Sequence, residues 1–572
     1  MSMLDQLAGR HFAEAVPARF ALSVPERADL ELNDRGNAAR LLAAYGQDLL
    51  FVPGKGWGVW DGMRFSFQSG GLAAAEIAAR LPDLIQEEIE AVKAREFDEF
   101  TLERRMRQEH EKRNGKRYLD LQDVAQDMRA ELIKRLAAHQ IKCGNVDKQV
   151  KALKAAEWQV RAEIHDLDAD PWVLVVQNGM VDLKAVKDMR PREGTADNPE
   201  PFAKWRAGWL KPVDRTGRPT KVAGTVFVPG AECPAWESFM ELVVPDEAIR
   251  RCLQRCFGAL VFGRNVAQVA LLLRGGGGNG KSTLTKIIGE VLGTFGGYAQ
   301  PAKVEMFLQT QNQSAGQASP EEVDLPGARM IVASEPAVTD VFSAKKIKSM
   351  TGGDLRPARA LGMPQFIYRP TAVPVISFNR TPRIKDEDEG TRRRLVFIPL
   401  EVSLRELPPE RRKTEIEAEA ALRAELPGIL NWMLDGFRDF YTRIEAGSGT
   451  PPGIDPPPSM LALKDRIMEA ADPVGTFLRE CAEIGDPAKY RVPTPEFFRA
   501  FKAWARDNGA RVFSDAALRD NLSEKGFEKG KVQGNMVFKG FRWQDDPLVQ
   551  RYLTESPTFT GGGGQYDESD FR

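Results

Sequence analysis

A glycine-rich stretch in the middle of the chain has the residue types that hold a phosphate group. Residues 269–293 read as an apolar strand, a run of glycines and an amphipathic helix. Glycines let backbone N–H groups turn toward an anion at the start of a helix, where the helix dipole also favours negative charge. The spacing is that of the P-loop, and it predicts binding of a nucleoside triphosphate. The predicted contacts are Gly275, Gly276, Gly277, Gly278, Asn279, Gly280, Lys281, Ser282 and Thr283.

Two side chains of this loop have specific expected roles. Lys281 should reach the β- and γ-phosphates, and Ser282 should offer its hydroxyl to Mg²⁺. ATP and Mg²⁺ are therefore the expected cofactors.

A second apolar strand, residues 328–334, delivers Glu335 to its carboxyl end. P-loop enzymes place an acid there to hold Mg²⁺ and to activate water. Ser334 stands where many such motors carry another acid, so Glu335 is the expected base, with metal contact partly through water. An ordinary acid at a strand end is the alternative.

A third apolar strand, residues 372–378, ends in Asn379. An amide at that place can orient the attacking water, or it can simply open the turn that follows. Three arginines then precede another apolar strand, and they cannot all point one way on a strand. Arg393 and Arg394 are candidates for an arginine finger that enters a neighbouring subunit's ATP site. A solvated basic corner is the alternative.

The length of 572 residues exceeds one core and predicts several domains. The expected fold class is multidomain α/β: a P-loop motor similar to the AAA+ type, a mainly helical domain before it and a winged helix after it. The helical prediction rests on residues 72–165, where apolar and charged residues alternate at helical spacing. The predicted divisions are a flexible arm (1–32), the helical domain (33–230), the motor with its helical tail (231–445), a Gly/Pro-rich linker (446–469), the winged helix (470–545) and a disordered acidic tail (546–572).

Composition excludes few classes of protein. Hydrophobic content is 42%, charged content 28% and net charge −1, so DNA binding would need local basic surfaces rather than a global field. No apolar run approaches the roughly 20 residues that cross a bilayer. The five cysteines are scattered and odd in number, which predicts buried thiols in a reducing cytoplasm, including Cys252 and Cys256 on one helix face.

The segment from Lys345 to Arg359, with Thr351-Gly352-Gly353-Asp354 at its centre, resembles a signature of the superfamily three helicases. The resemblance is to the phage and plasmid primase–helicase family, which is related to the poxvirus primase–helicase. It implies a hexameric ring with ATP sites between subunits, in which Asn379 is a sensor and Arg394, or else Arg393, is the finger. It also implies that residues 356–369 form a hairpin in the pore with its turn at residues 361–364. This turn lacks the lysine or histidine of viral relatives, so the expected DNA contacts are Lys348, Arg356 and Arg359.

The segment 470–545 predicts helices at residues 473–481, 494–508 and 514–525, followed by a β-wing that ends at Trp543. Basic residues outnumber acids near the wing, which suits contact with a DNA backbone through Lys525, Lys529 and Lys531. A merely solvated wing is the alternative. The acidic tail could dock a replication partner through its aromatic residues, or it could be disordered without a partner.

A primer-synthesising centre would need clustered carboxylates. Asp166, Asp168 and Asp170, after His165, are the one tempting group, but no polymerase-sized domain surrounds them. Priming is therefore expected from another polypeptide.

The predicted function is an ATP-dependent ring DNA helicase that unwinds duplex DNA to replicate a phage, plasmid or other mobile element. The expected partners are single-stranded and forked DNA, further copies of the chain and a separate primase or other replication protein, with no membrane, in the cytoplasm of a bacterial host. The alternative is an origin-binding or loading protein that assembles on DNA without processive unwinding. A small-molecule kinase would not need the flanking domains or the arginine triplet.

Overall fold

The computed structural model describes residues 20–112, 120–188, 206–309, 320–336, 340–379, 383–385, 389–408, 414–510, 512–532 and 534–554. The chain divides into two compact units. The first comprises residues 1–380 and 388–457, and the second comprises residues 381–387 and 458–572. No helix in the described part of the chain is both long and apolar enough to span a membrane.

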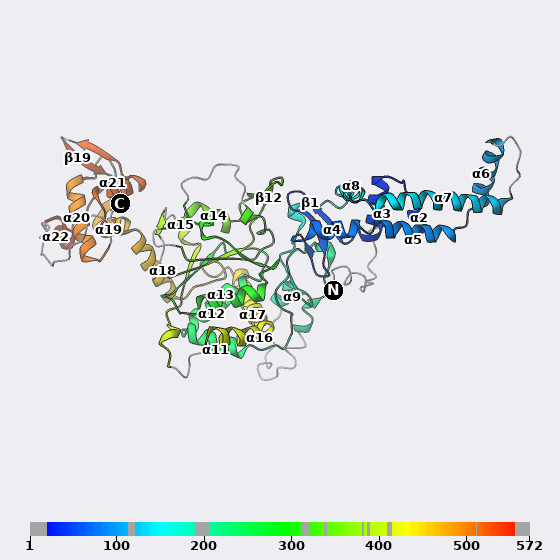
Figure 1. The fold of residues 1–572 in the computed structure, drawn as a ribbon. Coiled ribbons are helices and arrows are strands. Elements are labelled where there is room, and N and C mark those ends of the chain that lie inside the picture. The colour runs from blue at the N-terminus through cyan, green and yellow to red at the C-terminus, as the bar shows by residue number, and fades with distance from the viewer. Residues whose placement is uncertain are drawn as a thin grey trace. The chain divides into compact units, whose positions relative to one another are not determined.

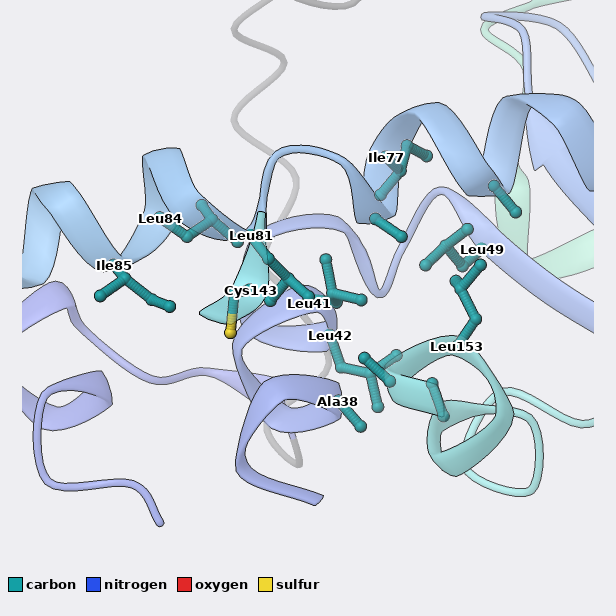
Figure 2. Close-up of a cluster of buried hydrophobic side chains, with 14 of the residues drawn as sticks. Ala38, Leu41, Leu42, Leu49, Ile77, Leu81, Leu84, Ile85, Cys143 and Leu153 are labelled. Carbon is teal, nitrogen blue, oxygen red and sulfur yellow. The ribbon is translucent and has the colours of Figure 1, made fainter. Parts of the chain in front are cut away.

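The first unit begins with helices packed on a small antiparallel sheet, as the helical periodicity predicts. The helices are α2 (Val24–Arg27), α3 (Asp34–Tyr45), α4 (Gly70–Ala78), α5 (Leu81–Lys93), α6 (Glu99–Lys112), α7 (Leu121–Cys143) and α8 (Val146–Ala156). The sheet consists of β1 (Leu49–Val52), β2 (Gly56–Trp60) and β3 (Phe65–Ser66) in that order. Apolar side chains of α3, α4, α5, α7, α8 and β1 meet in one core, which Figure 2 shows around Leu41 and Leu81. In Figure 1, α5 and α7 run side by side away from this core.

A buried ion pair corrects the prediction of a flexible arm over residues 1–32. Arg40 on α3 and Glu88 on α5 are both fully buried, and Arg40 Nε donates to both carboxylate oxygens of Glu88 at 3.0 Å. The same guanidinium donates to the backbone carbonyls of Arg27 and Glu31, so it ties the segment before α3 to the helices. Phe20 and Ala28 are buried in the core as well. Residues 20–32 are thus part of the folded unit, and residues 1–19 lie outside the described residues.

A second small antiparallel sheet precedes the central sheet. It consists of β4 (Val173–Val176), β5 (Gly179–Asp182) and β6 (Leu210–Lys211), and α9 (Leu183–Asp188) follows β5. Short 3₁₀ turns lie elsewhere in this unit at η2 (Ile164–Asp166), η3 (Arg215–Gly217), η4 (Val304–Met306), η5 (Pro320–Glu322) and η6 (Leu404–Glu406).

The centre of the first unit is a five-stranded parallel sheet in the order β15-β7-β13-β9-β8. The strands are β7 (Ala270–Arg274), β8 (Ala299–Pro301), β9 (Met330–Ser334), β13 (Val373–Phe378) and β15 (Leu395–Pro399). All six residues of β13 are buried, as expected for a strand covered by helices on both faces. Because β13 lies between β7 and β9, the carboxyl ends of these three strands are neighbours at one edge.

Helices cover both faces of this sheet. Right-handed crossovers from β7 to β8 and from β9 to β13 run in opposite directions along the sheet, so they place α13 and α14 on opposite faces. Figure 1 shows α14 and α15 across the sheet from α12, α13 and α17. The helices are α11 (Pro234–Val243), α12 (Glu247–Ala259), α13 (Lys281–Leu292), α14 (Ala344–Thr351), α15 (Glu389–Arg392), α16 (Glu415–Ala424) and α17 (Leu426–Glu445). Three further strands are β10 (Val341–Ser343), β11 (Arg356–Ala358) and β12 (Phe366–Tyr368).

Helices α12 and α17 approach each other through a glycine on each. A methyl group built on Gly258 would lie 2.2 Å from the backbone of Gly436, and one built on Gly436 would lie 2.2 Å from the carbonyl oxygen of Gln254. We expect Gly258→Ala to force the helices apart and to lower the free energy of unfolding by about 1–3 kcal/mol. Denaturant unfolding measures this change. The matched control is Gly71→Ala on α4, where an added methyl group meets nothing within 4 Å, and it should leave stability unchanged or raise it by up to about 1 kcal/mol. Equal effects of the two changes would contradict the close approach.

The segment predicted as a linker over residues 446–469 is largely folded. Ile454 is completely buried, and the buried Arg255 of α12 donates to the carbonyl oxygens of Ile454 and Asp455. Residues 446–457 thus pack on the helical tail of the central sheet, and the remaining residues of the predicted linker begin a helix. The prolines and glycines of residues 446–454 lie in turns that pack against the folded unit, so this stretch is not a flexible linker.

The second unit is the compact α+β segment predicted at the C-terminal end. Its helices are α18 (Pro458–Ala471), α19 (Pro473–Cys481), α20 (Thr494–Asp507), α21 (Asp515–Glu524) and α22 (Pro547–Thr554). Its strands are β14 (Arg383–Lys385), β16 (Ala482–Ile484), β17 (Arg491–Pro493), β18 (Lys529–Val532), β19 (Asn535–Lys539) and β20 (Phe541–Trp543). The helix boundaries at 473–481, 494–508 and 514–525 are confirmed to within one residue.

The predicted disordered tail over residues 546–572 begins with α22, whose side chains Val549 and Tyr552 are buried against the rest of the second unit. These two side chains lie three positions apart and therefore share one face of the helix, so residues 546–554 belong to the folded unit. The acidic end of the tail, residues 555–572, lies outside the described residues.

Candidate functional site

The predicted phosphate-binding loop lies between β7 and α13, at the carboxyl end of a central strand. Gly277, Gly278 and Gly280 have φ angles of 101°, 64° and 78°, which only glycine adopts readily. The first helical residue is Lys281, which is 7% exposed and donates from Nζ to the carbonyl oxygen of Gly275 at 2.8 Å. The lysine side chain therefore folds back over the loop that precedes it.

Two of the loop glycines, Gly275 and Gly280, are needed for close packing. A methyl group on Gly275 would lie 2.5 Å from the carbonyl oxygen of Leu400, and one on Gly280 would lie 2.9 Å from Val243 Cγ1. At Gly276 and Gly277, in contrast, an added methyl group meets nothing within 4 Å. The loop is thus packed on one side and open on the other, which is the arrangement a bound phosphate chain requires.

The electrostatics of Lys281 connect it with the predicted acid. Burial lowers the pKa of Lys281, and the negative charge of Glu335 acts in the opposite direction. The two groups are therefore near enough to interact across the edge of the sheet. A triphosphate placed on the loop would supply further negative charge and would keep Lys281 protonated.

Glu335 and Asn379 occupy the ends of the two strands next to β7. Glu335 directly follows β9, and its N–H donates to the carbonyl oxygen of Ser377 on β13 at 2.9 Å. Asn379 directly follows β13 and is exposed. Neighbouring strands are about 4.8 Å apart, so the backbones of Gly275, Asn379 and Glu335 fall within about 10 Å of one another. The sheet brings the predicted lysine, amide and acid to one place.

The backbone of Glu335 has a φ of 58°, in the left-handed region that costs a side-chain-bearing residue about 1–2 kcal/mol. Strain of this kind persists where the surrounding structure holds it, and it concentrates at functional sites. It supports Glu335 as more than an ordinary acid at a strand end.

The donor set fits Mg²⁺ held together with a nucleotide. Ser282 offers an exposed hydroxyl in the first turn of α13, and Glu335 offers an exposed carboxylate. No group of three or more His, Cys, Asp or Glu side chains that could hold a metal occurs among the described residues. A magnesium ion is commonly held by one or two protein oxygens plus phosphate oxygens and water, so a larger protein cage is not required.

Arg393 and Arg394 lie at the opposite edge of the sheet from the phosphate loop. The N–H of Ala270, the first residue of β7, donates to the carbonyl oxygen of Arg394, and β15 begins at the next residue. The phosphate loop starts only after β7 ends at Arg274, and five strand residues span about 16 Å. Neither arginine can therefore reach the phosphate loop of its own chain by a short extension.

The two arginines differ in exposure and in their contacts. Arg394 is half-buried and donates to the carbonyl oxygen of Gly390 at 2.6 Å and to Gln268 Oε1 at 3.0 Å. Arg393 is exposed, with one long hydrogen bond of 3.4 Å to the same Gln268 oxygen. The arginine triplet directly precedes a strand, as predicted. Arg392 ends α15, and Arg393 and Arg394 form the turn before β15. Of the two predicted finger residues, Arg393 is thus the more exposed to solvent.

Gln268 was not singled out in the sequence, yet it holds both arginines. It has a φ of 56°, the only non-glycine residue besides Glu335 in the described part of residues 231–445 with such a backbone. A lone glutamine before a strand carries no signal of this role, because the contact depends on β15 lying beside β7.

The predicted hairpin is present as β11 and β12, which pair antiparallel with Arg356 opposite Tyr368. Its turn falls at the expected place: Met363 N–H donates to the carbonyl oxygen of Ala360, and Gly362 has a φ of 73°. Leu361 is 81% exposed at the tip. The turn therefore presents an apolar side chain rather than a basic one.

Arg356, one of the predicted DNA contacts, forms an internal ion pair at the base of this hairpin. It donates to both carboxylate oxygens of Glu322 at 2.9 and 2.6 Å and to Ser349 of α14. Tyr368 donates its hydroxyl to the same carboxylate at 2.8 Å. This guanidinium is occupied in holding the hairpin, so the expectation of DNA contact is better carried by Lys348 on α14, which is half-buried, and by Arg359, which is exposed.

We expect Glu322→Ala to loosen the hairpin. The change leaves the Arg356 guanidinium without its carboxylate, and because the pair is 18% and 11% exposed we expect a cost of about 2 kcal/mol rather than the 3–5 kcal/mol of a fully buried pair. Amide hydrogen exchange of residues 356–368 should speed up accordingly. Glu321→Ala removes an exposed neighbouring carboxylate and is the control. Unchanged exchange in Glu322→Ala would show that the hairpin is held by other contacts.

The second unit presents only part of its predicted basic surface. Lys529 and Lys531 are exposed two residues apart on β18, so they share one face of the β18–β19 hairpin. Lys525 instead forms an ion pair with Asp472 at 2.5 Å, which engages its charge within the unit. Lys529 and Lys531 remain the exposed DNA-contact candidates of this unit.

The acidic group near residue 166 supports loops. Asp168 accepts hydrogen bonds from the backbone N–H and the hydroxyl of Thr220, and Asp166 pairs with Arg218 at 2.9 Å. These carboxylates have structural partners.

All five cysteines are free buried thiols, Cys252 and Cys256 among them.

Comparisons with known proteins fall on both parts of the first unit. A family model described as D5 N terminal like matches residues 38–245, and one described as a family of unknown function (DUF5906) matches residues 273–394. A protein named "Putative helicase L207/L206" of Acanthamoeba polyphaga mimivirus is 32% identical over 161 residues, 28% of this chain and 16% of its own length. "Putative helicase 022R" of Frog virus 3 is 35% identical over 171 residues, 29% of this chain and 17% of its own length. "Putative helicase 121R" of Invertebrate iridescent virus 3 is 24% identical over 283 residues, 47% of this chain and 29% of its own length.

The chain thus covers less than a third of the length of these viral relatives. Among solved structures, "The apo structure of NrS-1 C terminal region (305-718)" is 13% identical, with a TM-score of 0.33, over 54% of this chain and 76% of that one. The sequence relatives and the first family model agree with the resemblance drawn from the motifs.

Proposed function

We propose, on the premise that this chain is a relative of the phage and viral primase–helicases, that it is an ATP-dependent ring helicase that unwinds DNA for replication. The observation that carries the proposal is the division of the predicted catalytic residues between the two edges of one sheet. Lys281, Glu335 and Asn379 gather at the carboxyl edge, and Arg393 projects at the amino edge.

This division favours catalysis between subunits. A group that stabilises the transition state must contact the transferred phosphate, and Arg393 is too far from its own loop to do so. In a head-to-tail ring, each amino edge faces the next subunit's carboxyl edge, so every site receives an arginine. Each ATP site would then contain Lys281, Ser282, Glu335 and Asn379 from one subunit and Arg393 from its neighbour.

The individual roles follow from chemistry. Lys281 and the loop amides would bind the β- and γ-phosphates, and Ser282 would hold Mg²⁺, which offsets the phosphate charge. Glu335 would accept the proton of the attacking water, and Asn379 would hold that water by its amide. Arg393 would neutralise the charge that develops on the transferred phosphoryl group.

A physical path leads from the finger to the hairpin within one chain. Gln268 holds Arg393 and Arg394 together, and Gly352 at the end of α14 lies beside Arg394, since a methyl group there would be 3.6 Å from Arg394 Nη2. Helix α14 in turn contacts the base of the hairpin through Ser349 and Arg356. A finger drawn into a neighbour's site would thus move the support of the hairpin that would grip DNA.

Strand displacement from a forked duplex tests the proposal. We expect ATP and Mg²⁺ to be needed for displacement of the labelled strand, and increasing salt to weaken DNA binding because the contacts are to phosphates. ATP-dependent binding without displacement would favour the alternative of an origin-binding or loading protein. Electron microscopy with an ATP analogue and forked DNA would show whether the particles are closed rings.

A further inference from the structure

The segment that follows β15 wraps the outer side of the phosphate loop. The N–H of Leu400 donates to the carbonyl oxygen of Arg274, and the N–H of Leu404 donates to the carbonyl oxygen of Gly278 at 2.9 Å. Asn279, which is 4% exposed, donates its side-chain amide to the carbonyl oxygen of Val402 at 2.9 Å. Residues 400–404 are therefore fastened at three places, once to the end of β7 and twice to the loop.

These bonds fix how the loop faces the ligand. The carbonyl oxygens of Arg274 and Gly278 are engaged on the outer side, and Gly278 holds its left-handed backbone with the carbonyl turned toward Leu404. A peptide whose carbonyl points outward directs the following N–H the opposite way. The fastening thus helps to aim loop amides at the phosphate chain.

The next residue along this segment, Arg405, reaches the loop itself. A methyl group built on Gly278 would lie 2.9 Å from Arg405 Nε and 3.2 Å from its Cδ and Cγ atoms. The glycine at position 278 is therefore needed for this side chain to fit as well as for the φ of 64°. Arg405 is exposed, and its guanidinium forms no ion pair with a carboxylate of the described residues.

We propose that Arg405 binds the phosphate chain of the nucleotide held by its own subunit, which makes it a second cation of the site beside Lys281. The inference rests on the proposed function, because it assumes that the loop binds a nucleoside triphosphate. Arginine suits this task, since its planar guanidinium can give two parallel N–H bonds to phosphate oxygens. It differs from Arg393 in acting within the subunit, on binding rather than on the transition state.

The test measures the dissociation constant for ADP and for ATP by calorimetry on the full chain. We expect Arg405→Ala to raise the dissociation constant about tenfold for both nucleotides, the effect typical of a lost charge-assisted hydrogen bond at an exposed site. Arg405→Lys should recover part of the affinity, because it keeps the charge without the paired bonds. Glu406→Gln changes the exposed neighbouring residue and should leave the affinity at the wild-type value.

The same measurement in an Arg393→Ala background tests whether the contact is made within the subunit. The tenfold effect of Arg405→Ala should persist there, since it does not depend on the neighbour's finger. Unchanged affinity in Arg405→Ala, or an effect that vanishes in the Arg393→Ala background, would overturn the inference while wild-type binding of ATP still stands. If the wild-type chain itself bound neither ADP nor ATP, the proposed function would fail instead. Equal thermal midpoints of the variants would show that the fold is intact.

Discussion

Arg393→Ala should lower the turnover number for ATP by about 10³-fold or more while leaving ATP binding nearly unchanged. The reason is the placement of Arg393 at the amino edge of the sheet, where it is exposed and far from its own phosphate loop. An arginine that enters the neighbour's site only when charge develops on the phosphoryl group contributes to kcat and little to affinity. Steady-state hydrolysis with single-stranded DNA present, together with calorimetric ATP binding, separates the two effects.

Mixing makes the test specific for action between subunits. Arg393→Ala chains retain an intact phosphate loop, and Lys281→Ala chains retain an intact finger. A mixture of the two variants should regain part of the hydrolysis that neither shows alone, because some interfaces pair an intact loop with an intact finger. Arg251→Ala on α12 removes an exposed arginine paired with Glu247 and is the matched control. A mixture that stays inactive, or a full loss of ATP binding in Arg393→Ala, would refute a finger supplied by the neighbour.

Lys281→Ala should lower hydrolysis and strand displacement by on the order of 10²–10³-fold, because it removes the charge at the transferring phosphate. This lysine is buried at the start of α13, and its Nζ donates to the carbonyl oxygen of Gly275. ATP affinity should fall as well, since a charged hydrogen bond to a phosphate is worth about 1.5–3 kcal/mol. Hydrolysis, binding and fork displacement measured on one preparation check all three.

Lys286→Ala is the matched control for this change. Lys286 lies on the same helix, five positions after Lys281. Its Nζ lies 2.6 Å from a carboxylate oxygen of Glu419, with which it forms an ion pair. Removing a partly exposed pair should cost at most about 1 kcal/mol of stability and leave turnover unchanged. If Lys281→Ala hydrolysed ATP at the wild-type rate, the glycine-rich loop would have to be a turn without a nucleotide.

The family resemblance that the motifs indicated is confirmed by the D5 N terminal like match and by the viral relatives. The motifs could be recognised because each is local. Residues 269–293 contain strand, loop and helix signals in direct succession, and each of Glu335 and Asn379 follows an apolar run that has to be a strand. The hairpin at residues 356–369 was implied by the family resemblance, and the helices near residues 473 and 494 were predicted from nearby residues.

Contacts between residues far apart in the sequence could not be predicted from local patterns. Arg356 meets Glu322, 34 positions earlier, and this pairing changes it from a predicted DNA contact into a support of the hairpin. Arg394 donates a hydrogen bond to Gln268, 126 positions earlier, and Arg393 is the more exposed of the two arginines. Arg405 reaches Gly278 because β15 lies beside β7. None of these partners is marked by periodicity or by composition.

The sequence by itself determined the strands and helices around the phosphate loop and which residue types stand at their ends, since hydrophobic spacing and glycine conformation act within a few residues. It did not predict α18 and α22, which lie in the segments predicted as a linker and a disordered tail. Only the tertiary structure decided the order of the strands, and hence which ends share an edge and which arginine is extended. It also decided that residues 20–32, 446–457 and 546–554 are ordered, because their stability comes from burial against remote side chains such as Arg40 and Arg255. Burial and ion pairing depend on which residues far apart in the sequence come into contact, and no local sequence pattern specifies those contacts.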